Sequence, residues 1–116
     1  IPIQYALTYP ERFETSEKRL SLTDAGKMTF FKPDFETFQC LSTCISAIKD
    51  GGLKPAAANG ANEAAVALFL EQKISFLQIG ELVKAATDNQ LVGKITSVED
   101  IYDADRAARE FVYSNI

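Results

Sequence analysis

Two amides, a glycine and a carboxylate interrupt the most alanine-rich stretch of this chain, Pro55–Leu70, at Asn59, Gly60, Asn62 and Glu63. Such polar side chains could bind a polar ligand, because they supply hydrogen-bond donors and acceptors. Asparagine and glycine also weaken a helix, glycine by about 1 kcal/mol, so a compensating interaction is expected. We favour a structural interpretation, in which the small residues admit a neighbouring segment and the polar groups bond an irregular connector. The sequence therefore predicts a structural hub, with a polar ligand site as the alternative.

A group of acidic residues near the C-terminus has the composition most like a metal site: Glu99, Asp100, Asp103 and Asp105. Their spacing lacks the alternating oxygen ligands and the glycine of a calcium loop, and helix N-termini favour acids. Ser97 and Asp100 fit a capping box instead. Asp105 with Arg109, and Arg106 with Glu110, are spaced as exposed helical pairs. We predict capping and ion pairing, with no metal-binding residue.

No catalytic or cofactor-binding residue can be assigned from the sequence. Histidine is absent, which excludes imidazole catalysis, and no glycine-rich phosphate loop is present. Tyr5, Tyr9 and Phe13 could line a ligand surface, although aromatic residues more often pack against a domain. Cys40 and Cys44 are expected to be packed thiols rather than a disulfide.

The composition is that of one globular domain of 116 residues, with 47% hydrophobic and 24% charged residues. The net charge of -4 disfavours nucleic-acid binding and membrane-surface binding. No apolar run approaches the roughly 20 residues that a bilayer span needs. We therefore expect a cytoplasmic protein.

The pattern predicts a mainly α fold, with a small four-helix bundle preceded by a short helix, an extended connector and one orphan β-strand. The short helix ends before Pro10, the strand covers Lys27–Lys32, and Gly51-Gly52 separates the first two bundle helices. Residues 34–116 are assigned to the helical domain, and residues 1–33 to the short helix and the connector that precede it. A lone strand must pair with another chain or with a sheet outside this sequence.

Each bundle helix has a predicted buried stripe at spacings of three and four residues. The first stripe comprises Leu41, Cys44, Ile45 and Ile48. The second comprises Ala58, Ala61, Ala65, Leu68 and Phe69. The third comprises Phe76, Ile79, Leu82, Val83 and Ala86, and the fourth comprises Val98, Ile101, Ala104, Ala108, Phe111 and Val112. Leu91 and Val92 are expected to touch the core. Ser75 and Gln78 fit a capping box, flanked by a hydrophobic staple of Ile74 and Ile79.

Three segments together resemble a known family: Pro2–Arg12 (PIQYALTYPER), residues 20–34 (LSLTDAGKMTFFKPD) and residues 61–66 (ANEAAV). In this order they are similar to the C-terminal part of the 1-deoxy-D-xylulose 5-phosphate reductoisomerase family. The similarity continues through Lys73–Ile79 and Val98–Arg109, so it covers essentially the whole chain.

The resemblance implies a parent enzyme that converts 1-deoxy-D-xylulose 5-phosphate to 2-C-methyl-D-erythritol 4-phosphate for isoprenoid biosynthesis by the non-mevalonate pathway. It implies NADPH and Mg²⁺ or Mn²⁺, bound by residues upstream of this chain, and a homodimeric parent. The partners of this chain would be the upstream domains of the same polypeptide. A plastid location is expected if the source is a plant or alga. The chain alone is predicted to be inactive and to bind neither cofactor; the alternative is an independent helical protein-interaction module.

Overall fold

The computed structural model describes residues 2–90 and 93–116, and the chain divides into two units, Ile1–Lys32 and Pro33–Ile116. The first unit contains α1 (Pro2–Thr8) and α2 (Leu22–Ala25), joined by an irregular segment. The short first helix was predicted, whereas α2 was not. Ser21 starts α2, because its hydroxyl accepts a hydrogen bond from the Asp24 N–H at 3.3 Å.

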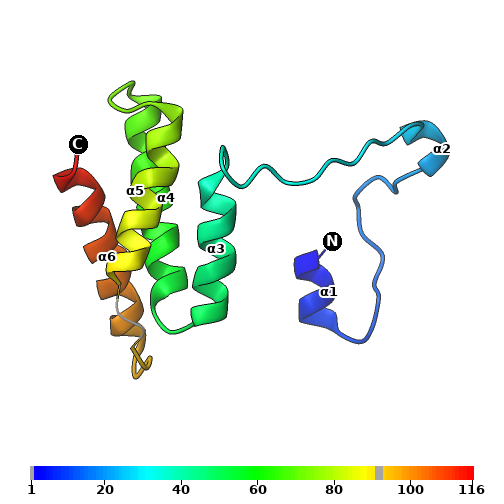
Figure 1. Cartoon of the computed structure of the whole chain (residues 1–116). Helices are drawn as coiled ribbons and strands as arrows, with labels where there is room; N and C mark the ends of the chain where they lie inside the picture. The colour runs from blue at the N-terminus through cyan, green and yellow to red at the C-terminus, as the bar shows by residue number, and fades with distance from the viewer. Residues whose placement is uncertain (1, 91–92) are drawn as a thin grey trace. The chain divides into compact units, whose positions relative to one another are not determined.

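The second unit is the predicted four-helix bundle (Figure 1). It consists of α3 (Gln39–Asp50), α4 (Lys54–Leu70), α5 (Phe76–Asn89) and α6 (Val98–Ser114). Helix α4 packs against the other three, and α5 also contacts α3 and α6, whereas the described residues of α3 and α6 do not touch. Helices α3 and α6 are therefore the two outer members, and each leaves one side uncovered by the bundle.

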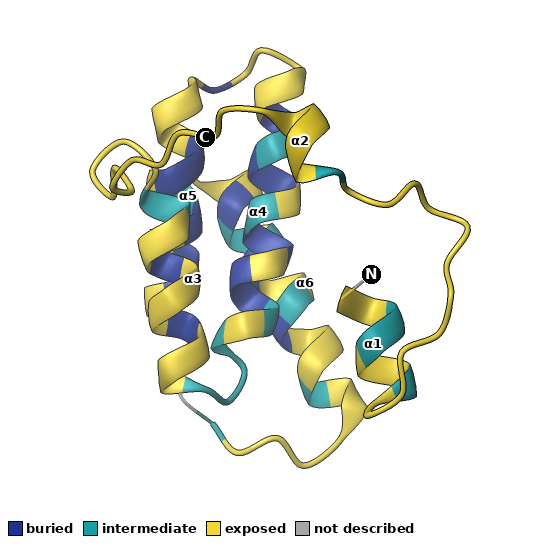
Figure 2. Ribbon diagram, turned by 90° about the vertical axis from the view of Figure 1, so that its right-hand side faces the viewer, coloured by how far each residue is buried: buried dark blue, intermediate teal, exposed yellow. Residues whose placement is uncertain are grey.

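Small side chains form most of the core around α4. Its buried residues are Ala57, Ala58, Gly60, Ala61, Ala64, Ala65 and Leu68. Helix α5 contributes Ile79, Val83 and Ala86, and α6 contributes Ala104, Ala108 and Val112. The dark buried positions in Figure 2 follow these inner helix faces. Because methyl groups replace long side chains, the helix backbones approach one another closely.

Local signals set the helix boundaries as predicted. Gly51 follows α3 at a φ of 71°, and its N–H donates to the carbonyl of Ala47 at 2.9 Å. Gly52 has a φ of 58°, and a Cβ there would lie 2.5 Å from the carbonyl oxygen of Gly93, so only glycine fits this turn. The Ser75 N–H donates to Gln78 Oε1 at 2.7 Å, which confirms the predicted start of α5.

The prediction for the buried face of α3 is wrong. Leu41, Cys44, Ile45 and Ile48 are exposed, and the helix instead buries Thr43 and Ala47. Periodicity identified an apolar stripe, but the inner position of α3 accepts only small side chains against α4 and α5. On the other helices, the smaller members of each predicted stripe are buried. The large residues at the helix ends are exposed: Phe69, Phe76, Val98 and Ile101.

The predicted strand at Lys27–Lys32 is not confirmed, because these residues have irregular structure and no strand occurs among the described residues. A strand is defined by its hydrogen-bond ladder to a neighbour, and this segment has no such neighbour among the described residues of its unit. Leu91 and Val92, which were expected to touch the core, lie outside the described residues. In the described part of the chain, no helix has the length and hydropathy needed to cross a bilayer.

Candidate functional site

The predicted hub residues lie on α4, and two of them join a polar cluster with α6. Arg109 donates from Nη2 to Glu63 Oε2 at 2.5 Å and from Nε to Asp105 Oδ2 at 2.7 Å. A second bond from Nη2 reaches Asp105 Oδ1 at 3.2 Å. Asn59 Nδ2 donates to Glu63 Oε1 at 3.2 Å. The guanidinium therefore bridges two carboxylates, one from its own helix and one from α4.

Gly60 allows this cluster to form, because it lets α6 approach the backbone of α4. A Cβ added at Gly60 would lie 2.6 Å from Oδ1 of Asp105 and 2.8 Å from its backbone carbonyl oxygen. Both distances are shorter than any normal carbon–oxygen contact. The glycine thus permits close helix packing. Asn59 and Glu63 bond each other and Arg109 of α6, whereas the prediction had them bond backbone groups of an irregular connector.

The electrostatics of the cluster favour its charged form. The hydrogen bond from Arg109 is the main cause that lowers the pKa of Glu63 below its usual value, followed by the bond from Asn59. The bonds to Asp105 and Glu63 raise the pKa of Arg109. Glu63 is nevertheless exposed, so solvent screens the pair. Both oxygens of Glu63 accept hydrogen bonds, one from Asn59 and the other from Arg109.

Asn62 does not belong to this cluster. Its half-buried side chain points to the other side of α4 and lines two shallow hollows beside α3. Within residues 2–90 and 93–116, its amide has no hydrogen-bond partner. Asn59 bonds Glu63 and also lines one of these hollows, so the hub residues extend from the α6 contact to the open side of α4 beside α3.

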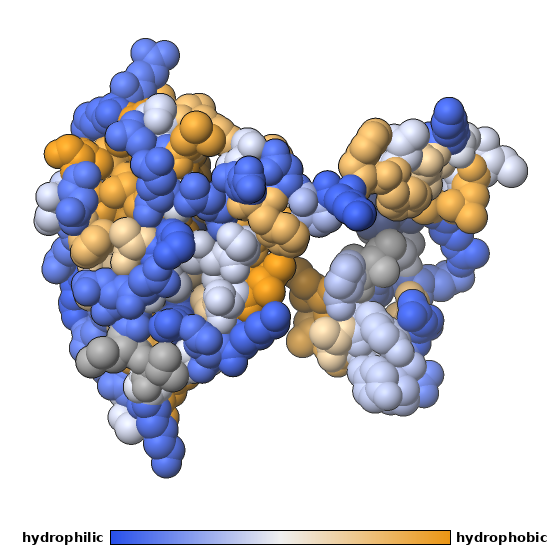
Figure 3. Space-filling view, viewed as in Figure 1, coloured by the Kyte–Doolittle hydropathy of each residue, from blue (hydrophilic) through white to orange (hydrophobic). Residues whose placement is uncertain are grey.

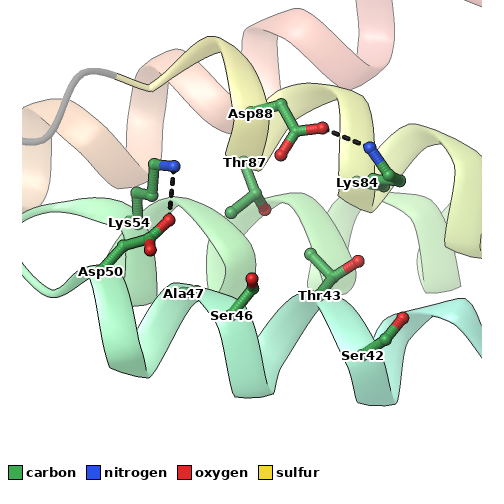
Figure 4. A pocket seen from close by; sticks show the side chains of 9 residues that line it. All are labelled: Ser42, Thr43, Ser46, Ala47, Asp50, Lys54, Lys84, Thr87 and Asp88. Carbon is green, nitrogen blue, oxygen red and sulfur yellow. Dashed lines mark hydrogen bonds and ion pairs between the residues drawn. The ribbon is translucent and has the colours of Figure 1, made fainter.

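A polar hollow of about 250 Å³ lies between α3 and α5 (Figure 4). Its lining residues are Ser42, Thr43, Ser46, Ala47, Asp50, Lys54, Lys84, Thr87 and Asp88. Two lysines in one hollow could attract an anion, but Lys54 binds Asp50 at 2.7 Å and Lys84 binds Asp88. Each cation is thereby neutralised by a carboxylate of the same hollow. This arrangement is typical of a polar seam between packed helices.

Asp100, Asp103 and Asp105, near the start of α6, have structural partners. Asp100 Oδ2 accepts hydrogen bonds from the Thr96 N–H at 2.7 Å and the Ser97 N–H at 2.9 Å, which confirms the predicted cap. These bonds also lower the pKa of Asp100, with Thr96 as the main cause. The Asp105–Arg109 pair is confirmed, whereas Arg106 pairs with Asp103 rather than Glu110. In the described ranges, no three potential ligands among Cys, Asp and Glu are grouped to hold a metal ion.

The aromatic and cysteine candidates have contacts of their own. In the first unit, Arg12 lies 4.2 Å above the ring of Tyr5, which also makes an edge contact with Tyr9. The two cysteines of α3 are free thiols. Cys40 is partly buried, and this burial is the main cause that raises its pKa, whereas Cys44 is exposed rather than packed as expected.

Sequence reasoning missed the partner of Glu63. Arg109 is 46 positions away in the chain, so no local spacing rule connects the two residues. The sequence did show an acid, Glu63, close to Gly60 on the same helix and without a basic partner at helical spacing. This pattern indicates that another segment packs closely, but not which segment it is.

The chain is similar in sequence to one known enzyme family. Residues 1–111 match a family model described as the DXP reductoisomerase C-terminal domain. The chain is 47% identical over 113 residues to 1-deoxy-D-xylulose 5-phosphate reductoisomerase of Chloroherpeton thalassium, covering 97% of this chain and 29% of that protein. It is 44% identical over 115 residues to the protein of the same name from Bacillus pumilus, covering 98% and 30%.

Solved structures of proteins with this name have a similar fold over the matched residues. The reductoisomerase from Zymomonas mobilis in complex with NADPH matches with a TM-score of 0.79 at 39% identity, covering 97% of this chain and 30% of that one. A DOX-P reductoisomerase in complex with NADPH, fosmidomycin and magnesium matches with a TM-score of 0.74 at 32% identity and the same coverage. The chain therefore spans less than a third of the length of these relatives.

Proposed function

The chain belongs to the DXP reductoisomerase C-terminal domain family, and we propose that it is the C-terminal portion of an NADPH-dependent reductoisomerase. The whole enzyme would convert 1-deoxy-D-xylulose 5-phosphate into 2-C-methyl-D-erythritol 4-phosphate for isoprenoid biosynthesis. The observation that carries this proposal is the match over 97% of the chain to a relative of which it covers only 29%. The role of this portion is structural.

The acidic residues described above do not fit a magnesium ion. The carboxylates of Glu63 and Asp105 at the α4–α6 contact bind Arg109, and that of Asp100 at the α6 cap accepts from backbone N–H groups. A magnesium site needs carboxylate oxygens free to face the ion. In this proposal, NADPH and Mg²⁺ or Mn²⁺ are held by residues outside this chain, and no reaction step is assigned to the residues described above.

Residues 1–33 form the end of the catalytic domain and the connector, and residues 34–116 form the helical domain. The whole enzyme is a homodimer in the cytoplasm, or in the plastid if the source is a plant or alga. The hub at Asn59, Gly60, Asn62 and Glu63 holds the bundle together. The ion pair between Glu63 and Arg109 supports this role.

The test compares two proteins in one assay, the 116-residue chain and the polypeptide that contains it together with its preceding domains. NADPH oxidation is followed by absorbance, with and without 1-deoxy-D-xylulose 5-phosphate. We expect oxidation that depends on the sugar phosphate only with the longer polypeptide. Activity of the 116-residue chain alone would contradict the structural role, and a correctly folded but inactive longer polypeptide would contradict the enzyme assignment.

A further inference from the structure

The bundle has an apolar face that the described residues of the second unit leave largely exposed. It consists of Phe38, the residue before α3, and of Leu41, Ile45 and Ile48 on α3, at steps of three and four residues, and we call it the outer α3 face. Their exposed fractions are 52%, 43%, 40% and 72%. Phe38 also makes an edge contact with Phe76 of α5. Figure 3 shows hydrophobic side chains at the surface along this helix. A contiguous apolar patch on a helix indicates an interaction surface, whereas scattered exposed residues do not.

The outer α3 face is distinct from the face that α3 uses within the bundle. Ala47 and Thr43, 1% and 6% exposed, pack toward α4 and α5. Ser42, Ser46 and Lys49 occupy a third, polar side, as expected for a helix surface that stays in water. Helix α3 therefore has two apolar faces, and the bundle covers only one of them.

Two hollows extend this face onto α4. One, of about 280 Å³, lies between Cys44, Ala47 and Ile48 of α3 and the α4 residues Pro55, Ala58, Asn59 and Asn62. The other, of about 210 Å³, continues past Asn62 toward Phe38 and Phe76. Asn62 lies in both hollows. Its unpartnered amide can donate to one backbone carbonyl and accept from one backbone N–H, which suits an approaching polypeptide segment.

The small volumes of the two hollows favour a protein partner over a small molecule. Both hollows are smaller than the roughly 300–1,000 Å³ of typical ligand sites, and they are open and continuous with a helix stripe. Side chains that protrude from a protein surface can fill such shallow hollows, while the stripe supplies apolar contact area. The nearby amide then fixes the register of the contact.

We propose that the outer α3 face and the hollows around Asn62 form the surface on which the preceding domains of the same polypeptide dock. This inference rests on the proposed function, in which this chain is the last part of a longer enzyme. The relatives extend over more than three times the matched length, so they contain an additional protein surface of the required size. A tethered partner meets the face at millimolar effective concentration, so a patch of modest area is sufficient.

The reactivity of Cys44 can show whether this face is covered, because its exposed thiol lines the larger hollow beside Ile48. The experiment measures alkylation of Cys44 by iodoacetamide with peptide mass spectrometry, in a Cys40→Ser background. It compares the 116-residue chain with the polypeptide that also contains the preceding domains. We expect Cys44 to react at least about tenfold more slowly in the longer polypeptide, because docking removes the thiol from solvent.

Matched variants of α3 test whether this protection comes from the outer face. In the longer polypeptide, Ile45→Asp with Ile48→Asp should restore fast labelling of Cys44. Lys49→Asp, on the polar side of α3, should not. Circular dichroism of each variant confirms that the helices are intact.

Equal labelling rates in the two wild-type lengths would overturn the proposal. A second result would also overturn it. If Cys44 of the 116-residue chain is labelled more slowly at higher protein concentration, a second copy of the chain occupies the face. The labelling does not depend on turnover. Protection of Cys44 in a longer polypeptide without reductoisomerase activity would therefore refute the proposed function and leave the docking surface standing.

Discussion

Replacing Gly60 with alanine tests the close approach of α6 to α4. In an ordinary exposed helix this change would stabilise the protein by about 1 kcal/mol through helix propensity. Here the new Cβ would lie 2.6 Å from Oδ1 of Asp105 and 2.8 Å from its backbone carbonyl oxygen. A carboxylate can rotate away, but a backbone carbonyl moves only if the helix moves.

The structure therefore predicts that Gly60→Ala destabilises the protein. Overpacking of this kind costs about 1–3 kcal/mol, which exceeds the propensity gain of about 1 kcal/mol. We expect a net loss of about 1 kcal/mol, which lowers the melting temperature by roughly 4–8 °C for a bundle of this size. The displaced Asp105 also weakens its bond to Arg109, and this adds to the loss.

Gly80→Ala is the matched control. Gly80 also lies inside a helix, but the nearest atom to an added Cβ is the side-chain Cβ of Gln39, at 3.0 Å. Gln39 is the first residue of α3, where a small shift costs less than moving two packed helices. Urea denaturation of both variants should give the lower midpoint for Gly60→Ala. Equal stabilisation by the two substitutions would refute the close helix approach.

Three further predictions concern the cluster, the α6 cap and the thiols. The lowered pKa of folded Glu63 means that its stabilisation is present above the unfolded value of about 4.3 and is lost as the pH falls through the folded value. Glu63→Gln should therefore flatten the acid-side decline of the urea midpoint, and an unchanged decline would contradict the pairing. Ser97→Ala should cost about 0.5–2 kcal/mol in thermal unfolding, because it removes the hydroxyl that accepts the Asp100 N–H. In the 116-residue chain near a pH of about 8, Cys44 should be alkylated faster than Cys40, whose pKa is raised; equal rates would count against its burial.

Local signals were sufficient to predict the bundle from the sequence. Gly51 ends α3, and Ser97 with Asp100 starts α6, because caps depend on residues three or four positions apart. Such contacts form within one turn, and distant parts of the chain do not alter them. The four helices and the short first helix were predictable for this reason.

The buried face of α3 and the partner of Glu63 were not predictable in this way. Periodicity shows that Leu41, Ile45 and Ile48 share a face, but not whether that face meets this domain or another surface. The answer depends on the space beside α4, where only Ala47 and Thr43 fit. The Glu63–Arg109 bond likewise depends on how two distant helices cross. Local spacing contains no information on either point.

The small side chains of α4 have a thermodynamic consequence. In the part of the chain that the structure describes, the largest side chains that are fully buried are only valines, Val83 and Val112. Unfolding then exposes less apolar surface per residue than in a domain with a leucine or phenylalanine core, and the heat-capacity change of unfolding follows that surface. The bundle should have a heat-capacity change below the usual ~12–15 cal/mol/K per residue. Its stability should consequently vary only gently with temperature, with a shallow maximum and a broad thermal transition.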